Sequence, residues 1–124
     1  MRVAEADLLI VPGLGGSGPD HWQTRWEQKL STAQRVNQKD WHQPNLADWT
    51  TALTQAVEDA QRPVVLIGHS LGIYAIANSA RHFVADKVRG GFLVTPPALR
   101  NLAGIPGVDP AFGAIDHITL PFPS

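Results

Sequence analysis

The sequence contains no cysteine. This absence excludes disulfide bonds, CxxC redox or zinc motifs, and a thiol nucleophile. An excess of charge is also missing, because ten basic and eleven acidic residues leave a net charge of -1. Charges scattered at this balance give no electrostatic footprint for nucleic acid or an anionic membrane. We therefore expect a small or neutral ligand, with no nucleic-acid partner and no membrane partner.

Long apolar runs are absent as well. No run reaches the roughly 18 residues that a membrane span needs, and the N-terminal MRVAEADLLIVPG is too short and too charged for a signal peptide. We therefore expect a cytoplasmic protein. The 124 residues predict a single domain over residues 1–124.

Short apolar runs alternate with segments of helical periodicity. Strands are expected at 7–11, 36–41, 63–68 and 88–95, and helices at 20–30, 48–60 and 71–83. This alternation predicts an α/β fold in three layers, with a mostly parallel sheet and helices on both faces. Ligands of such sheets bind at the carboxyl ends of the strands.

The first expected helix has its apolar residues on one face. Trp22, Trp26 and Leu30 recur at i, i+4 and i+8, so polar residues such as Gln23 are expected to point elsewhere, and Asp20 is a candidate cap. In the second helix, expected to open at Asp48, the apolar stripe consists of Trp49, Leu53, Val57 and Ala60. We interpret the tryptophans as core residues.

The sequence GHSLG, residues 68–72, follows the expected strand at 63–68 and precedes a helix. The bare pattern arises by chance in roughly one chain of this length in 25, but the strand-turn-helix context is that of a nucleophile elbow. In an elbow the serine occupies a strained, tight turn, and side chains two residues to either side would collide with the strand and the helix. Ser70 is therefore the candidate nucleophile.

An oxyanion hole needs two backbone donors. The N–H of Leu71, at the start of the helix, is the first candidate. The second is expected from the glycine-rich PGLGG that follows the first strand, with Leu14 N–H preferred and Gly15 N–H next. GLGGSG also satisfies GxGxxG loosely, so a nucleotide-binding loop is an alternative, although proline follows the last glycine and no GK[ST] is present.

Several motifs together resemble a known family. IVPGLGGSGPDHWQTRWE, VVLIGHSLG, VTPPA and LPFPS resemble the small α/β-hydrolase-fold serine hydrolases of the YdeN and retinoblastoma-binding-protein-nine type, over essentially the whole chain. The resemblance implies hydrolysis of esters or related acyl substrates by a Ser, Asp, His triad. It implies Ser70 as nucleophile, an oxyanion loop at 13–16, and an Asp and a His beyond residue 124, so that the sheet lacks its C-terminal strands.

Histidines within the chain are weaker candidates for the base. His69 is expected to point away from Ser70, and His21 is expected either to line the substrate cleft or to pack at the helix start. The pair Asp116–His117 is unfavourable, because adjacent residues in an extended segment point to opposite faces. The remaining candidates are interpreted as surface, turn or solvated residues: His42, His82, Asp86 and Asp109.

Three functions therefore remain open: an esterase-like serine hydrolase, a catalytically inactive binding module with the same fold, and a nucleotide-binding domain. We expect no cofactor, and no metal, because HExxH motifs and carboxylate clusters at ligand spacing are missing. A sheet that stops after the strand at 88–95 would leave an open edge, which invites pairing with a second copy as a homo-oligomer.

Overall fold

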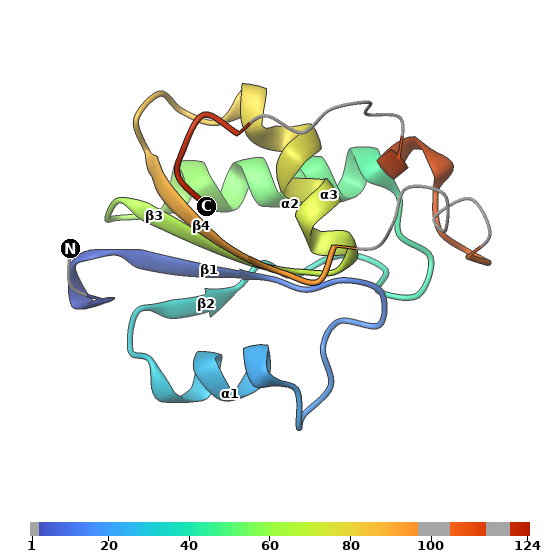
Figure 1. The fold of residues 1–124 in the computed structure, drawn as a ribbon, viewed down its shortest axis with the longest axis horizontal. Coiled ribbons are helices and arrows are strands. Elements are labelled where there is room, and N and C mark those ends of the chain that lie inside the picture. The colour runs from blue at the N-terminus through green and yellow to red at the C-terminus, as the bar shows by residue number, and fades with distance from the viewer. Residues whose placement is uncertain (1–2, 97–104, 114–119) are drawn as a thin grey trace.

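The computed structural model describes residues 3–96, 105–113 and 120–124 (Figure 1). Four parallel strands form one sheet in the order β2-β1-β3-β4. Their bounds are Asp7–Val11 for β1, Ala33–Arg35 for β2, Val64–His69 for β3 and Val88–Val94 for β4. The α/β fold class with a parallel sheet is confirmed.

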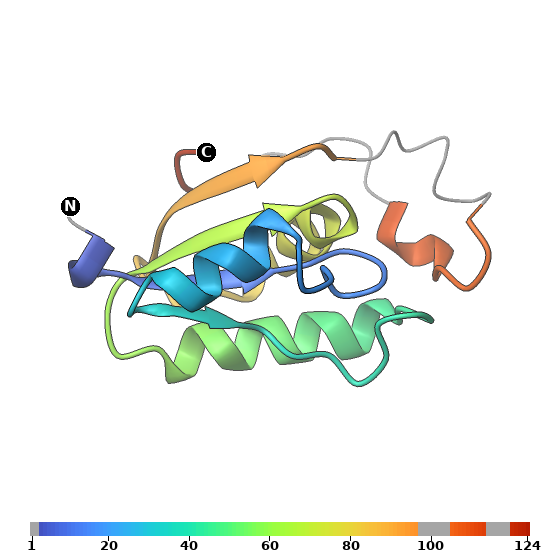
Figure 2. The same ribbon diagram turned by 90° about the horizontal axis from the view of Figure 1, so that it is seen from below.

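Three helices cover the two faces of the sheet. Helix α1, Trp22–Lys29, lies on one face, while α2, Leu46–Asp59, and α3, Leu71–Ser79, lie on the other (Figures 1 and 2). Short 3-10 turns occur at Val3–Glu5, Ala80–His82 and Pro110–Gly113. No helix in the described ranges combines the length and the apolarity that crossing a membrane requires.

The central strands are apolar on both sides, as expected for a parallel sheet between helices. The larger core cluster joins the sheet to α2 and α3 and includes Leu9, Val11, Leu66, Trp49, Leu53, Val57, Tyr74 and Ile76. A smaller cluster of Leu8, Ile10 and Ile67 receives the stripe predicted for α1, namely Trp22, Trp26 and Leu30. Both helical stripes are confirmed.

The observed bounds of β2, α1 and α2 differ from the predicted ones at positions where polar residues pair or cap the element. Strand β2 forms at Ala33–Arg35 instead of 36–41, because a short edge strand needs backbone pairing more than an apolar pattern. Helix α2 begins at Leu46, and the side chain of Asn45, not Asp48, caps it by accepting from Asp48 N at 3.0 Å. Helix α1 is capped by His21 in place of Asp20.

The segment 105–113 packs across the start of α2. Phe112 is fully buried against Trp49, with ring centroids 5.4 Å apart. Asp109, expected to be solvated, accepts backbone N–H groups of Leu46 at 3.0 Å and Ala111 at 3.0 Å through its two carboxylate oxygens. The expectation was wrong because one partner lies 63 positions away in the sequence.

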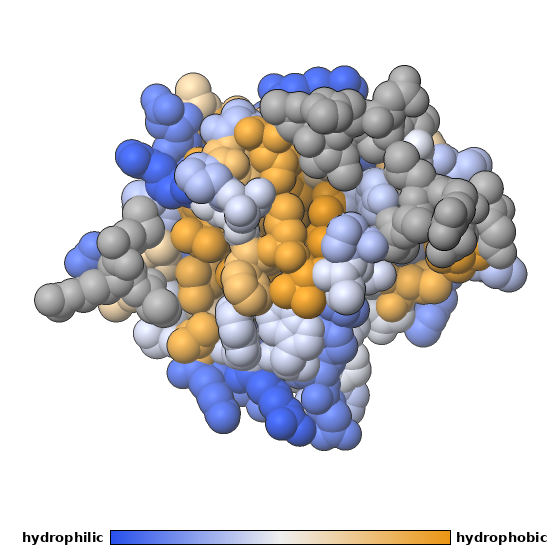
Figure 3. All heavy atoms as spheres, viewed as in Figure 1, coloured by the Kyte–Doolittle hydropathy of each residue, from blue (hydrophilic) through white to orange (hydrophobic). Residues whose placement is uncertain are grey.

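Strand β4 is an edge strand, as predicted, but part of its outer edge is covered. Gly91 N donates to Pro123 O at 2.8 Å, and Phe122 is buried beside Gly91. Figure 3 shows apolar side chains gathered over β4 and α3 on this face. The expected homo-oligomer stays a prediction.

We expect Asp109→Ala to lower the free energy of unfolding by about 1–2 kcal/mol, because two partly buried N–H groups lose their acceptor. Urea unfolding measures this loss. The matched control is Asp20→Ala, whose side chain is exposed, and it should change stability by less than about 0.5 kcal/mol. Equal stabilities of the two variants would contradict the structural role of Asp109.

Candidate active site

Ser70 occupies a strained turn between β3 and α3. Its φ of 52° and ψ of -124° lie outside the regions that non-glycine residues usually adopt. Ser70 N donates to Val94 O at 3.1 Å, so the end of β4 holds this turn. The side chain is half-buried, and no hydrogen-bond partner of Ser70 Oγ occurs among the described residues. The backbone thus has the sharp bend that the GHSLG motif predicts.

The two glycines that flank this turn lie where a side chain would collide. A Cβ on Gly68 would lie 2.8 Å from Ile76 Cδ1, and one on Gly72 would lie 2.2 Å from Val11 O. Since real Cβ atoms do not approach a backbone carbonyl this closely, α3 can pack on the end of β1 only with glycine at position 72. The steric reason given for the motif is confirmed at Gly72, whereas a Cβ at Gly68 would meet the ends of the Ile76 and Leu93 side chains.

The first glycine-rich turn lies directly against the Ser70 turn. A Cβ on Gly13 would lie 3.0 Å from Leu71 N and 3.2 Å from Ser70 Cβ. The structure therefore brings the loop after β1 and the start of α3 together at the carboxyl edge of the sheet. Leu14, the next residue, is 44% exposed.

The predicted oxyanion donors differ in whether their N–H groups already have an acceptor in the protein. Gly15 N donates to Trp41 O at 2.9 Å and Gly16 N to Gly13 O at 3.1 Å, so neither of these N–H groups is free for a ligand. The N–H groups of Leu14 and Leu71 have no acceptor among the described residues. Leu14 and Leu71 therefore remain as candidate donors, and Gly15 does not. The same engaged amides argue against a nucleotide-binding loop.

A buried glutamine ties the loop to two strands. Gln23, fully buried on α1, donates through Nε2 to Val11 O at 3.3 Å and to Ile67 O at 2.9 Å. Its Oε1 accepts from the Ser17 hydroxyl at 2.6 Å. The expectation that Gln23 points away from the core was wrong, because three polar partners satisfy it inside the protein.

Arg35 and Thr24 fix the second half of the loop. Arg35 donates to Gly16 O, to Ser17 O at 3.2 Å and to Thr24 Oγ1 at 2.7 Å. The Thr24 hydroxyl lies 2.8 Å from Gly18 O, and Glu27 pairs with Arg35 at 3.3 Å. The sequence analysis did not predict this network. Its signal in the sequence is the run of polar residues on the face of α1 beside the tryptophan stripe.

His21 and His69 lie together on the α1 side of the sheet. Their ring centroids are 4.5 Å apart, and Trp22 contacts both rings. Burial lowers the pKa of His21 below its ordinary value, and the nearby charge of Arg35 lowers it further. Burial likewise lowers the pKa of His69, with a contribution from His21. Because His21 Nδ1 accepts from Gln23 N at 3.1 Å, the neutral ring carries its proton on Nε2.

The other titratable candidates do not approach Ser70 within the described residues. His42 and His82 are exposed, as expected. The pair Asp116–His117 lies outside the described residues. The helix-start role expected for His21 is observed, and its contribution to a substrate cleft stays a prediction.

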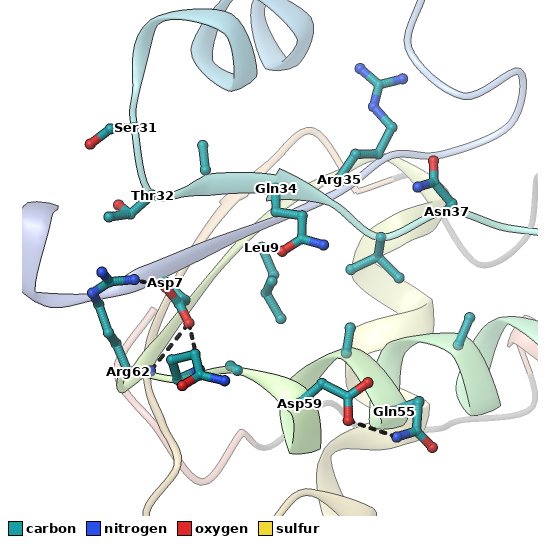
Figure 4. A pocket seen from close by; sticks show the side chains of 16 residues that line it. Asp7, Leu9, Ser31, Thr32, Gln34, Arg35, Asn37, Gln55, Asp59 and Arg62 are labelled. Carbon is teal, nitrogen blue, oxygen red and sulfur yellow. Dashed lines mark hydrogen bonds and ion pairs between the residues drawn. The ribbon is translucent and has the colours of Figure 1, made fainter.

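Two surface grooves lie away from Ser70. One of about 500 Å³ runs between β2 and α2, and at one end of it Asp7 and Arg62 pair at 2.9 Å (Figure 4). Arg35, on β2, is one of the lining residues, but its guanidinium points toward α1, where it contacts Thr24 and Glu27 (Figure 4). The other, of about 630 Å³, lies beside the start of β4. Ser70 lines neither groove.

Comparison with known proteins gives consistent matches. A model of the family described as "Serine hydrolase" matches residues 8–124. YdeN of Bacillus subtilis (strain 168), named as a hydrolase, is 26% identical over 115 residues, which cover 89% of this chain and 60% of YdeN. The chain therefore spans about 60% of the length of that relative.

Two solved structures are similar. A crystal structure from Pectobacterium atrosepticum, named as a YdeN-like hydrolase, matches with a TM-score of 0.72 and 32% identity, over 80% of this chain and 54% of that one. The crystal structure of the B. subtilis ydeN gene product matches with a TM-score of 0.55 and 26% identity, over 64% of this chain and 45% of that one.

We expect Gly72→Ala to lower the free energy of unfolding by about 3 kcal/mol or more, or to prevent folding, since the added methyl group meets the Val11 carbonyl. Gly18→Ala is the control, because nothing lies within 4 Å of a Cβ there, and its effect should be below about 0.5 kcal/mol. Chemical denaturation of both variants tests the contact. A Gly72→Ala protein as stable as the control would show that α3 does not pack on β1 in this way.

Acid should destabilise the fold through the two histidines. The pKa of each is lowered on folding, so the unfolded chain binds more protons below about pH 6.5, and the free energy of unfolding falls as the pH drops from about 7 to 5. His21→Asn keeps a capping acceptor but cannot titrate, and should show a shallower loss in urea unfolding at several pH values. The exposed His42→Asn should follow the wild type, and an unchanged slope in His21→Asn would contradict the assignment.

Proposed function

This chain belongs to the serine hydrolase family, and from that membership we propose that Ser70 is the nucleophile of an esterase-like hydrolase. The observation that carries the proposal is the strained Ser70 turn, with φ of 52°, pressed against the glycine-rich loop after β1. A serine held in this way at the carboxyl edge of a parallel sheet can present its hydroxyl to a carbonyl carbon.

The proposed reaction is a two-step acyl transfer. A histidine base accepts the proton of Ser70 Oγ, the oxygen attacks the carbonyl of an ester or related acyl substrate, and the leaving group departs with a proton from that histidine. Water then attacks the acyl-enzyme, and Ser70 regains its proton when the acid is released. The substrate is a small acyl compound, and no cofactor takes part in any step.

Negative charge on the carbonyl oxygen is held by backbone donors. Leu71 N–H, at the positive end of α3, and Leu14 N–H, in the loop that touches Leu71 through Gly13, are the proposed pair. Loss of one such donor typically costs about 10²–10³ in kcat. Two fixed amides would therefore supply a large share of the catalysis.

The base and acid of the triad are proposed to lie beyond residue 124. The family resemblance implies the order Ser, Asp, His, and the described residues place no histidine or carboxylate in hydrogen-bonding contact with Ser70 Oγ. Relatives such as YdeN extend over a greater length than this chain spans. The activity of the whole protein is thus part of the proposal.

A fluorophosphonate probe tests the nucleophile. Protein expressed from its intact gene should be labelled at Ser70, as located by peptide mass spectrometry, and Ser70→Ala should abolish labelling and lower kcat for a short-chain ester by about 10⁴-fold or more. Ser31→Ala, at an exposed serine before β2, should keep both signals.

Other outcomes would identify a different function. A folded, verified protein that neither reacts with the probe nor hydrolyses esters would favour an inactive binding module. Micromolar binding of ATP or NAD would favour the nucleotide-binding alternative. Labelling that persists in Ser70→Ala would place the nucleophile elsewhere.

A further inference from the structure

The side chain of Gln23 contacts both strands of the site and the glycine-rich loop that follows β1. It is fully buried, and its amide hydrogens reach Val11 O, at the end of β1, and Ile67 O, near the end of β3. These carbonyls lie 12 and 44 positions from Gln23 in the sequence. The amide therefore bridges β1 and β3 at the edge where their chains turn toward Gly13 and Ser70.

The same side chain also holds the far end of the glycine-rich loop. The Ser17 hydroxyl donates to Gln23 Oε1 at 2.6 Å, while the backbone of the loop begins at Val11. Gln23 thus contacts the loop at its start and near its end, beneath the segment that carries Leu14 N–H.

Val11 O lies between the Gln23 amide and α3. A Cβ on Gly72 would lie 2.2 Å from this oxygen, so the carbonyl is confined between the Gln23 amide and the first turn of α3. Leu71 N–H lies in that same turn, and a Cβ on Gly13, two residues after Val11, would lie 3.0 Å from Leu71 N. Val11 O therefore links the Gln23 amide to the turn that carries Leu71 N–H.

We propose that Gln23 is a positioning residue that sets the separation of the Leu14 and Leu71 amides, a role that rests on the hydrolase function proposed above. Gln23 does not touch the substrate. It acts by fixing the Val11 and Ile67 carbonyls, and the Ser17 hydroxyl, in one arrangement. Catalysis by fixed dipoles is sensitive to such positioning, because a displacement of about 1 Å can cost 10²-fold in rate.

The test replaces Gln23 by methionine, which keeps the volume and removes all three hydrogen bonds. We expect kcat for a short-chain ester to fall by about 10- to 100-fold with KM changed by less than threefold, and the inhibition constant of a boronic acid, which forms a tetrahedral adduct, to rise in parallel with the loss of kcat. Gln28→Met is the control, since Gln28 is exposed on the same helix, and its kinetics should match the wild type.

A structural readout makes the test independent of activity. In ¹⁵N NMR spectra, the amide signals of Gly13, Leu14 and Leu71 should shift in Gln23→Met but not in Gln28→Met. If Gln23→Met does not fold, Ser17→Ala removes only the hydroxyl and should shift the Leu14 signal with a smaller loss of kcat.

The outcomes separate the two proposals. A folded Gln23→Met with wild-type kcat and unshifted amide signals would overturn the positioning role while leaving the hydrolase intact. A lower thermal stability with kcat unchanged would do the same, since it shows a structural role only. Shifted amides in a protein whose wild type hydrolyses nothing would support the placement of the amides by Gln23 and refute the proposed function.

Discussion

The contact between the Val11 carbonyl and the first turn of α3 determines how the whole edge of the sheet is built. Because a Cβ at position 72 would lie 2.2 Å from this oxygen, the helix approaches β1 more closely than any residue except glycine permits. The approach brings Leu71 N–H beside Gly13, and it leaves Ser70 in a turn with positive φ. One close contact therefore accounts for three features: the strained backbone of Ser70, the need for glycine at position 72, and the short distance from the Gly13 loop to Leu71 N–H.

A strained backbone conformation persists only where several surrounding contacts hold it. Ser70 N is bonded to the end of β4, and α3 is anchored in the larger core through Ile76 and Tyr74. On the opposite side of the sheet, Gln23 donates to the carbonyls of Val11 and Ile67 near the ends of β1 and β3. Side chains such as Gln23 therefore hold the glycine-rich loop in place. Its glycines serve close packing against α3 more than mobility.

The sequence predicted the parts of this arrangement that depend on local pattern. The strand at 7–11 has the predicted bounds, GHSLG has its strand-turn-helix context, and the stripes of α1 and α2 face the core, the α1 stripe being partly buried. Gln23 and Asp109 were misjudged for a common reason. Apolar periodicity treats a polar residue as solvent-facing, whereas each of these two also has a partner in another element, 12 to 63 positions away. Strand β2 was not predicted at its observed bounds because its residues, AQR, show no apolar alternation.

The groups that support the glycine-rich loop differ in how they respond to acid. Gln23, Ser17 and Thr24 bind through amide and hydroxyl groups that do not titrate near neutral pH, so protonation leaves their bonds intact. His21 is different, because its Nδ1 must stay unprotonated to accept from Gln23 N. Protonation of that ring removes the cap of α1, the helix that carries Gln23, and brings a positive charge toward Arg35. The hydrogen bonds that Gln23, Ser17 and Thr24 make to the loop therefore do not depend on pH near neutrality. The helix that carries Gln23 does respond to pH, through protonation of His21.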